Sequence, residues 1–304
     1  MPESLSNKTV IIIAGPTAVG KTAIAVEIAK HFGTSVISAD SRQCYRELDI
    51  GVARPSSQQL QQVPHYFIGT HSIAEEVNAV TFEQYAVEKI NQIHHHNSIA
   101  VMAGGTGLYI RTFIEGMDDI PAISIEIRNE IYNQYKLHGL IWLQQKVKEK
   151  DPVFFEKGEV QNPQRLMRAL EVIEATGKSI ISFRKGVKVK RDFRIIKIGL
   201  EISKEQLYKN IYHRTEEMIN NGLIEEVRSL QQYRHLNALK TVGYAEIFQY
   251  LDQKILLSKA VEQINIHTRQ YAKRQLTWFK KDLEYKWFHP SDLSGILAFC
   301  LNNT

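Results

Sequence analysis

Residues 10 to 22 read VIIIAGPTAVGKT, and the architecture of the whole chain follows from them. Val10 to Ala14 is an apolar run rich in β-branched residues, which predicts a buried strand. Residues 15 to 22 then match G-x-x-x-x-G-K-[ST] at every fixed position, and Ala23 to Lys30 continues with helical spacing. A strand, a glycine-bounded loop and a helix in this order predict a P-loop.

In a P-loop, backbone N–H groups surround phosphate oxygens at the N-terminus of the following helix. The residues predicted to form this loop are Gly15, Pro16, Thr17, Ala18, Val19, Gly20, Lys21 and Thr22. Lys21 adds a mobile positive charge, and Thr22 offers a hydroxyl to a magnesium ion. An ordinary strand–helix turn is the alternative, but motif and context together favour phosphate binding.

Composition excludes several classes of protein. Of 304 residues, 43% are hydrophobic and 23% are charged, which is typical of a globular chain. The longest fully apolar run is about five residues, far below the ~20 that span a bilayer, and MPESLSNK lacks the build of a signal peptide. Cys44 and Cys300 form no disulfide framework, as expected in a reducing cytoplasm. The net charge of +5 suits a polyanionic partner without proving one.

An α/β core continues beyond the P-loop. Further strands are predicted at residues 35–38, 98–103, 194–202 and 284–289, while residues 49–72 are expected to form a loop. Asp40 follows the first of these strands and should face the P-loop, because open α/β sheets bind ligands at their carboxyl ends. The polar segment that it begins fits a capped turn as well as a catalytic loop. Glycines end the strand at 98–103 where P-loop ATPases often carry a magnesium-binding aspartate, which disfavours a nucleotide-hydrolysing motor.

From residue 115 to residue 194 the alternation of strands and helices stops and helical patterns dominate. The sequence therefore predicts an α/β fold: a P-loop core at 1–114 and 195–304, with a parallel sheet flanked by helices, plus an all-helical insertion domain at 115–194. Residues 184 to 194 carry six basic residues and one acidic residue, a concentration typical of a nucleic-acid contact.

The last long helix, through residues 268 to 281, interleaves basic and aromatic side chains. Arg269 and Lys273 share one face, and Tyr271, Arg274 and Trp278 line another. This pattern suits a nucleic-acid strand whose bases stack on aromatic rings.

Taken together, these stretches resemble the tRNA dimethylallyltransferases, also called tRNA isopentenyltransferases. The matching segments, in family order, are GPTAVGKT at 15–22, SADSRQCYR at 38–46, GVARP at 51–55, PH at 64–65, AGGTGLYI at 103–110, QNPQRLMRALE at 161–171, VGY at 242–244 and TRQYAKRQLTWF at 268–279. The resemblance implies transfer of a dimethylallyl group from dimethylallyl diphosphate to the exocyclic amine of the adenosine just 3′ of the tRNA anticodon, with release of diphosphate. It also implies dependence on Mg²⁺ and a cytoplasmic enzyme whose insertion contacts the anticodon stem-loop. We expect a monomer.

The resemblance implies roles for individual residues. Asp40 becomes the general base, or hydrogen-bond acceptor, for the attacking amine, and Thr17 lies beside the reacting centre. Arg214, which neighbouring acids alone would assign to a surface ion pair, becomes a ligand of the leaving diphosphate. The tRNA contacts implied are Asp40, Ser41, Arg42, Gln43, Thr106, Arg128, Gln161, Asn162, Pro163, Gln164 and Arg165. The basic residues Arg269, Lys273 and Arg274 of the last helix add to this set.

Three other functions compete with this one. A prenyltransferase acting on a free adenine nucleotide would need neither the insertion nor the basic stretches. A small-molecule kinase on the same core would reveal itself by phosphoryl transfer. A non-catalytic P-loop RNA-binding protein is disfavoured because Thr17, Lys21, Thr22, Asp40 and Arg214 are all intact.

Overall fold

The computed structural model describes residues 7–184, 186 and 188–304 and divides the chain into two compact units. One unit joins the chain up to Ile114 with Lys190–Thr304, and the other is Glu115–Val189. The predicted insertion, 115–194, begins at the same residue as the second unit, but that unit ends at Val189, five residues before the predicted end. Arg191 belongs to the core because its Nη2 lies 2.5 Å from Glu83 Oε1 and its Nε donates to Phe113 O at 2.8 Å. Lys185, one of the basic residues at 184–194, lies outside the described residues.

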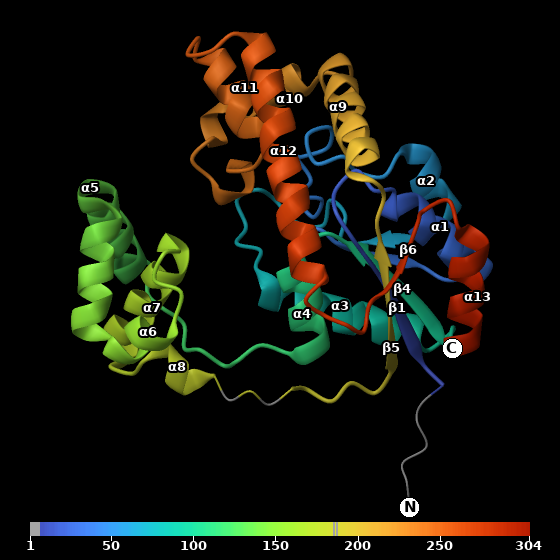
Figure 1. Ribbon diagram of the computed structural model, residues 1–304, viewed down its shortest axis with the longest axis horizontal. Helices are drawn as coiled ribbons and strands as arrows, with labels where there is room; N and C mark the ends of the chain where they lie inside the picture. The colour runs from blue at the N-terminus through green and yellow to red at the C-terminus, as the bar shows by residue number, and fades with distance from the viewer. Residues whose placement is uncertain (1–6, 185, 187) are drawn as a thin grey trace, which may run out of the picture. The chain divides into compact units, whose positions relative to one another are not determined.

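A six-stranded sheet forms the centre of the first unit, in the order β3-β2-β4-β1-β5-β6 (Figure 1). Its strands are β1 (Thr9–Ala14), β2 (Val36–Ala39), β3 (His65–Tyr66), β4 (Ile99–Gly104), β5 (Arg194–Leu200) and β6 (Lys286–Phe288). All neighbouring strands pair in parallel. This confirms the parallel α/β sheet predicted from the sequence.

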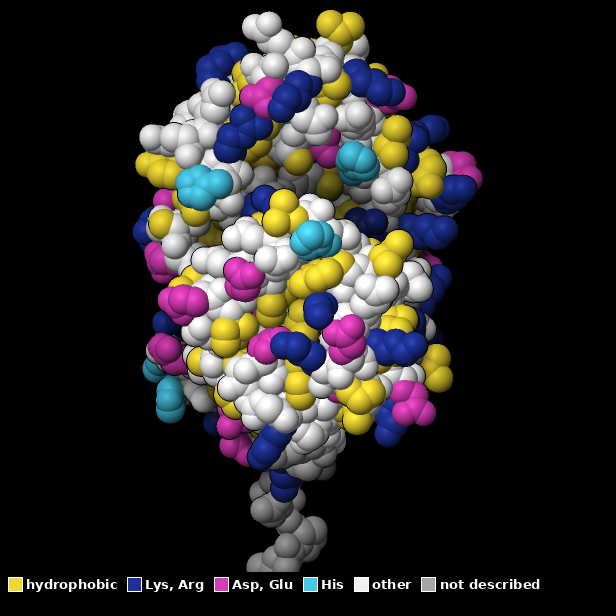
Figure 2. All heavy atoms as spheres, turned by 90° about the vertical axis from the view of Figure 1, so that its left-hand side faces the viewer, with side chains coloured by type: hydrophobic (Ala, Val, Ile, Leu, Met, Phe, Trp, Pro, Cys, Tyr) yellow, Lys and Arg dark blue, Asp and Glu magenta, His cyan; other side chains and the backbone are white. Residues whose placement is uncertain are grey.

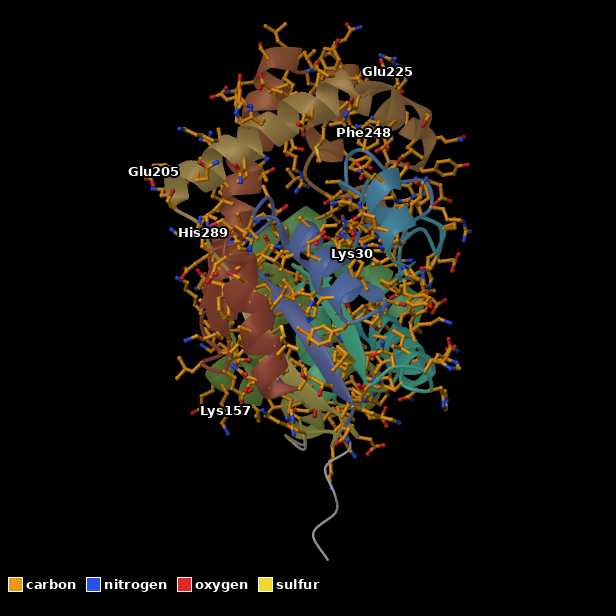
Figure 3. The ribbon with its side chains drawn as sticks, turned by 90° about the vertical axis from the view of Figure 1, so that its right-hand side faces the viewer. Lys30, Lys157, Glu205, Glu225, Phe248 and His289 are labelled. Carbon is orange, nitrogen blue, oxygen red and sulfur yellow. The ribbon has the colours of Figure 1, made fainter. Side chains whose placement is uncertain are left out.

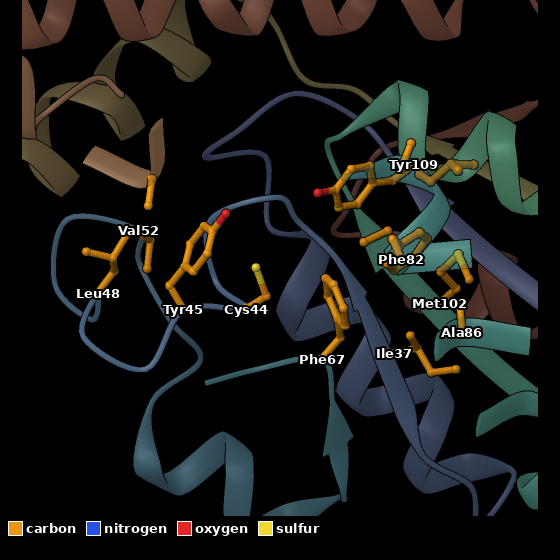
Figure 4. Packing of buried hydrophobic residues seen from close by; sticks show 14 of the residues in the cluster. Ile37, Cys44, Tyr45, Leu48, Val52, Phe67, Phe82, Ala86, Met102 and Tyr109 are labelled. Atoms are coloured by element: carbon orange, nitrogen blue, oxygen red, sulfur yellow. The ribbon is translucent and has the colours of Figure 1, made fainter. Parts of the chain in front are cut away.

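Helices cover both faces of this sheet, and β1 is fully buried between them. The helices of this unit are α1 (Lys21–His31), α2 (Ser57–Gln62), α3 (Ala79–Ile93), α4 (Gly107–Glu115), α9 (Lys204–Asn220), α10 (Leu223–Ser229), α11 (Tyr244–Leu251), α12 (Leu257–Phe279) and α13 (Leu293–Asn303), with 3₁₀ turns at Gln231–Tyr233 and Asn237–Leu239. Ile11 and Ile13 pack with α1 and α13, while Val10 and Ile12 point to the opposite core. That core continues through Phe67 and its neighbours (Figure 4).

The segment expected to be a loop at 49–72 contains two short elements, α2 and β3. Apolar periodicity could not reveal α2, because none of its six residues is buried. A capping box begins this helix: Ser56 Oγ accepts from Gln59 N, and Gln59 Oε1 accepts from Ser56 N. The S-x-x-Q pattern is thus the sequence signal that would have identified it.

The second unit is helical: α5 (Ile125–Lys150), α6 (Pro152–Lys157), α7 (Pro163–Thr176) and α8 (Ile180–Phe183). Gly139 interrupts α5 with φ of 75°, and Gly177 ends α7 with φ of 67°, both in the left-handed region that favours glycine. Leu143, Leu166 and Leu170 are buried in its own small core.

The site takes shape beyond the carboxyl ends of the strands. The helices α9, α10 and α11 lie there (Figures 1 and 3), and in Figure 3 the labels Glu205, Glu225 and Phe248 mark them in turn. The helix α12 starts beside them and runs back toward α4, so that Gly107 meets the ring of Trp278. Throughout the described part of the chain, every helix is too short or too polar to cross a membrane.

Candidate active site

The P-loop follows β1 in a conformation prepared for anions. Gly20 has φ of 99°, and among the described residues no side chain caps the N-terminus of α1, so its first N–H groups can bind a ligand. Ala18 also adopts a left-handed φ of 64°, and Asn210 Nδ2 holds its carbonyl oxygen at 3.0 Å. Lys21 Nζ folds back to donate to Gly15 O at 3.1 Å and Pro16 O at 2.7 Å.

Thr17 is held from two sides by helices that are distant in sequence. Arg214 Nη1, on α9, donates to Thr17 Oγ1 at 2.7 Å. Gln275, on α12, accepts from Thr17 N at 2.8 Å through Oε1 and donates to Gly105 O at 2.9 Å through Nε2. The arginine expected to bind diphosphate therefore lies directly on the P-loop, and not in a surface ion pair.

Asp40 follows β2 and shapes its own turn. Its Oδ1 accepts from Arg42 N at 2.8 Å and from Gln43 N at 3.3 Å. Thr106 braces the residues on either side, because Thr106 N donates to Ala39 O and Thr106 Oγ1 accepts from Ser41 N at 3.1 Å. Of the two alternatives from sequence, the structure shows the capped turn, formed by Oδ1, while a catalytic role of the same carboxylate stays a prediction.

Lys21, Asp40 and Arg214 lie close together, because Asp40 influences the pKa of both basic groups. Burial lowers the pKa of Lys21 to about 7, with Asp40 opposing the shift and Arg214 adding to it. Burial also lowers the pKa of Arg214, against the influence of Asp40 and Glu217. Burial raises the pKa of Tyr271 to about 12, with Asp40 contributing. A bound polyanion would favour the charged form of Lys21.

Two cavities meet at these residues, and Thr17, Asp40 and Arg214 line both of them. The smaller, of about 280 Å³, extends along Lys21, Thr22 and the β2–β3 side of the site. The larger, of about 790 Å³, lies against α9, α11 and α12. Its lining includes the apolar side chains of Val52, Ile211, Met218, Leu239, Val242, Phe248 and Ile264.

Gln43, expected to contact tRNA, is engaged inside the protein. Its Oε1 accepts from Ser38 Oγ at 2.8 Å, and its Nε2 donates to Ala53 O at 2.9 Å and Val52 O at 3.3 Å. The loop that it reaches is also held by Glu226, whose carboxylate accepts from three consecutive backbone N–H groups, those of residues 49 to 51. Val52 lines both cavities, so these hydrogen bonds hold part of the wall of each in place.

The predicted RNA-contacting residues of α12 differ in exposure. Lys273 and Arg274 are exposed, and the Arg274 guanidinium lies 5.9 Å from the centre of the Tyr271 ring. Arg269 is half-buried and lies 4.6 Å from the ring centre of Tyr208.

The remaining predicted contacts belong to the second unit. Asn162 Oδ1 caps α7 by accepting from Gln164 N at 3.0 Å and Arg165 N at 3.3 Å, and Pro163 takes the first helical position. Arg165 pairs with Glu159, and Arg128 Nε lies 3.9 Å from Glu171 Oε2. Gln161, Gln164 and Arg165 are exposed. Acidic and basic side chains are interspersed on the face shown in Figure 2.

Sequence reasoning missed three residues that shape this site: Gln275, Asn210 and Glu226. All three act through contacts with residues far away in the chain, so no local spacing reveals them. For Gln275 a signal exists: a glutamine in the apolar stripe of α12, between the buried residues Ala272 and Phe279.

Comparisons with known proteins agree with this geometry. The sequence model of the family described as IPP transferase matches residues 43–282. The tRNA dimethylallyltransferase 1 of Bacteroides thetaiotaomicron is 43% identical over 291 residues, which cover 96% of this chain and 94% of that protein. The full-length tRNA isopentenylpyrophosphate transferase of Bacillus halodurans superposes with a TM-score of 0.71 at 31% identity, covering 97% of this chain and 96% of that one.

A eukaryotic dimethylallyltransferase whose structures are described as acting on tRNA superposes with a TM-score of 0.74 at 26% identity, over 90% of this chain and 70% of that one. Sequence and structure thus agree over most of the length of the chain. The chain belongs to the IPP transferase family, together with the tRNA dimethylallyltransferases.

Proposed function

We propose that this chain transfers a dimethylallyl group from dimethylallyl diphosphate to the exocyclic amine of the adenosine 3′ of the anticodon in tRNA. Family membership makes it a prenyltransferase that modifies tRNA. The observation that carries the finer proposal is the meeting of Thr17, Asp40 and Arg214 at the P-loop. Anion-binding groups and one carboxylate therefore line the same two cavities.

In the proposed reaction the amine nitrogen forms a bond to the allylic carbon while that carbon leaves the diphosphate oxygen. The amine loses one proton, which passes to Asp40 Oδ2. A neutral adenine amine is a weak nucleophile, so a carboxylate that accepts its proton as the bond forms lowers the barrier. Because Oδ1 is held by two backbone N–H groups, the carboxylate is oriented before the substrate arrives.

The leaving diphosphate gains negative charge as the carbon departs. Backbone N–H groups of the P-loop, Lys21 and Arg214 stabilise that charge in the proposed mechanism. Arg214 is directed by its bond to Thr17, so its other nitrogens are positioned beside the loop. There is no γ-phosphoryl group to move, which accounts for the glycines at the end of β4.

Magnesium fits this site as an ion carried by the diphosphate. Thr22, which lines the smaller cavity, would supply a hydroxyl oxygen, and the described residues contain no cluster of three or more His, Cys, Asp or Glu that could hold a metal by itself. Mg²⁺ usually binds through one or two protein oxygens together with substrate phosphates. When bound, it would neutralise charge on the leaving group.

The larger cavity has room for the reacting parts of both substrates. Its volume of about 790 Å³ suits a nucleoside extruded from its stack together with a five-carbon chain. Its apolar lining would shield the allylic carbon from water. Exposed Lys273 and Arg274, with Gln161, Gln164 and Arg165 of the second unit, are the proposed contacts to the anticodon stem-loop. We further propose that the enzyme acts as a cytoplasmic monomer.

Label transfer from dimethylallyl diphosphate to unmodified tRNA tests the proposal. We expect label on tRNA, dependent on Mg²⁺ and absent when the adenosine beside the anticodon is replaced. Label on free AMP alone would instead identify a nucleotide prenyltransferase, and phosphoryl transfer from ATP would identify a kinase. Binding of tRNA without any transfer would leave only an RNA-binding protein.

A further inference from the structure

Gln275 connects two loops that approach the reacting centre from different strands. Its side chain is 6% exposed and both polar atoms are used, by Thr17 N on the P-loop and by Gly105 O on the β4–α4 turn. The amide has one orientation that satisfies both, because its oxygen must face the N–H group and its NH₂ group the carbonyl. The two contacts therefore fix the distance between the P-loop and this turn.

The β4–α4 turn in turn supports Asp40. Thr106, the residue after Gly105, binds Ala39 O through its N–H group and Ser41 N through its hydroxyl. The residues on both sides of Asp40 are thus attached to the turn that Gln275 holds. On the other side, Thr17 carries the hydrogen bond from Arg214.

We propose that Gln275 is a positioning residue that sets the separation between the P-loop, which binds the leaving diphosphate, and Asp40, which receives the proton. The inference rests on the proposed function. Gln275 is not among the described residues that line the two cavities, and it acts through Thr17 and the β4–α4 turn. Through Gln275, the helix α12 also supports the P-loop. The same helix carries the proposed RNA contacts Lys273 and Arg274.

A glycine supplies an independent way to disturb the same contact. A Cβ on Gly105 would lie 2.1 Å from Gln275 Nε2, while its next nearest atom outside Gln275 is Gly15 O at 3.6 Å. Gly105→Ala therefore displaces the amide and leaves the chemistry of Gln275 unchanged. Gln275→Met removes both hydrogen bonds at similar volume, and its flexible end can yield to an added Cβ.

The test is single-turnover transfer at saturating substrates, together with separate binding of tRNA and of inorganic diphosphate. Misplaced reacting groups can cost about 100-fold in rate, so we expect Gln275→Met and Gly105→Ala each to slow transfer by about 10–100-fold. Both dissociation constants should stay within about threefold of wild type. The double variant should be little slower than Gln275→Met alone, because the two changes disturb one contact. Gln270→Met, at an exposed glutamine of the same helix, should transfer at the wild-type rate.

Transfer by Gln275→Met within threefold of an active wild type would overturn the inference. So would losses in rate that multiply in the double variant, or losses matched by equal losses in tRNA and diphosphate binding. If Gln275→Met does not fold, Gly105→Ala in the intact protein decides alone, and a wild-type rate contradicts the inference. An inactive wild type would contradict the proposed function instead.

Discussion

Arg214 and Thr17 stand 197 residues apart in the chain, and a hydrogen bond of 2.7 Å joins Arg214 Nη1 to Thr17 Oγ1. This contact brings α9 onto the P-loop and places a second basic group there beside Lys21. Asp40 acts on both groups, since it opposes the lowering of the pKa that burial causes in each. Two basic groups and one carboxylate around one phosphate-binding loop suit a reaction in which an anion leaves while a proton is removed.

Replacing Arg214 by glutamine should slow the chemical step. Removal of one preorganised donor from a developing anion typically costs about 100- to 1,000-fold, and we expect a loss of this size in single-turnover transfer. The tRNA dissociation constant should stay within about twofold. The control is Arg228→Gln, at an exposed arginine on α10 whose Nη1 lies 3.6 Å from Glu225 Oε1. Equal rates for the two variants would remove Arg214 from the diphosphate site.

Asp40→Asn retains the oxygen that accepts from Arg42 N and removes the base. We therefore expect the turn to persist while the single-turnover rate falls by about 100-fold or more, with tRNA affinity nearly unchanged. Asp49→Asn changes an exposed carboxylate nearby and should leave the rate unaltered. An Asp40→Asn variant as fast as wild type would show that another group takes the proton.

Binding of diphosphate should be coupled to protonation of Lys21. With a pKa of about 7, Lys21 is mostly neutral in the free protein at pH 8, whereas a bound polyanion favours the ammonium form. Calorimetry in two buffers of different ionisation enthalpy should then show more proton uptake by wild type than by Lys21→Met at pH 8, and a smaller difference at pH 6. The comparison with Lys21→Met cancels the protons that the diphosphate itself exchanges. Equal proton exchange by the two proteins at pH 8 would contradict the role of Lys21.

The same pKa shift has a consequence for stability. Because the folded-state pKa of Lys21 lies below its ordinary value of 10.5, the unfolded state binds this proton more tightly between about pH 7 and pH 10.5. The contribution of Lys21 to the free energy of unfolding should therefore rise with pH across that window. Denaturant unfolding of wild type and Lys21→Met at pH 7 and pH 9 measures it, and the difference between the two proteins should shift in favour of wild type at pH 9.

Charge reversal at Lys273 and Arg274 should weaken tRNA binding and flatten its dependence on salt. Each lost phosphate contact reduces the slope of log K against log salt by about one. Lys259→Glu reverses a charge on the same helix at an exposed residue that pairs with Glu262, and it should keep the slope closer to wild type. If the Lys273→Glu/Arg274→Glu protein retained the wild-type slope, these two residues of α12 would not form a phosphate-binding surface.

The parts of this protein that follow from local chemistry could be predicted from its sequence. The P-loop, the strands of the sheet other than β3, and the helix breaks at Gly139 and Gly177 depend on short-range periodicity or on left-handed φ angles. The position of Asp40 at the end of β2 depends on the rule that parallel strands present their carboxyl ends together.

Long-range contacts could not be predicted in this way. Arg214 has acidic neighbours in sequence, yet its hydrogen-bond partner is Thr17. Gln43 sits in a segment assigned to tRNA, but the fold turns its amide inward to Ser38 and Ala53. Gln275 spans 258 residues to Thr17, and only tertiary packing brings the two together. The helix α2 could not be predicted from apolar periodicity because none of its residues is buried, and its capping box is the sequence signal that it carries.

The most direct test uses an anticodon stem-loop RNA with an unmodified adenosine 3′ of the anticodon, incubated with dimethylallyl diphosphate and Mg²⁺. Mass spectrometry of the digested RNA should show one C₅H₈ unit added to that adenosine and to no other nucleoside, with one diphosphate released for each RNA modified. The same RNA with guanosine at that position should remain unchanged. Prenylation at another position, or diphosphate release without RNA modification, would contradict the proposal that Asp40 and the P-loop together serve transfer to this adenosine.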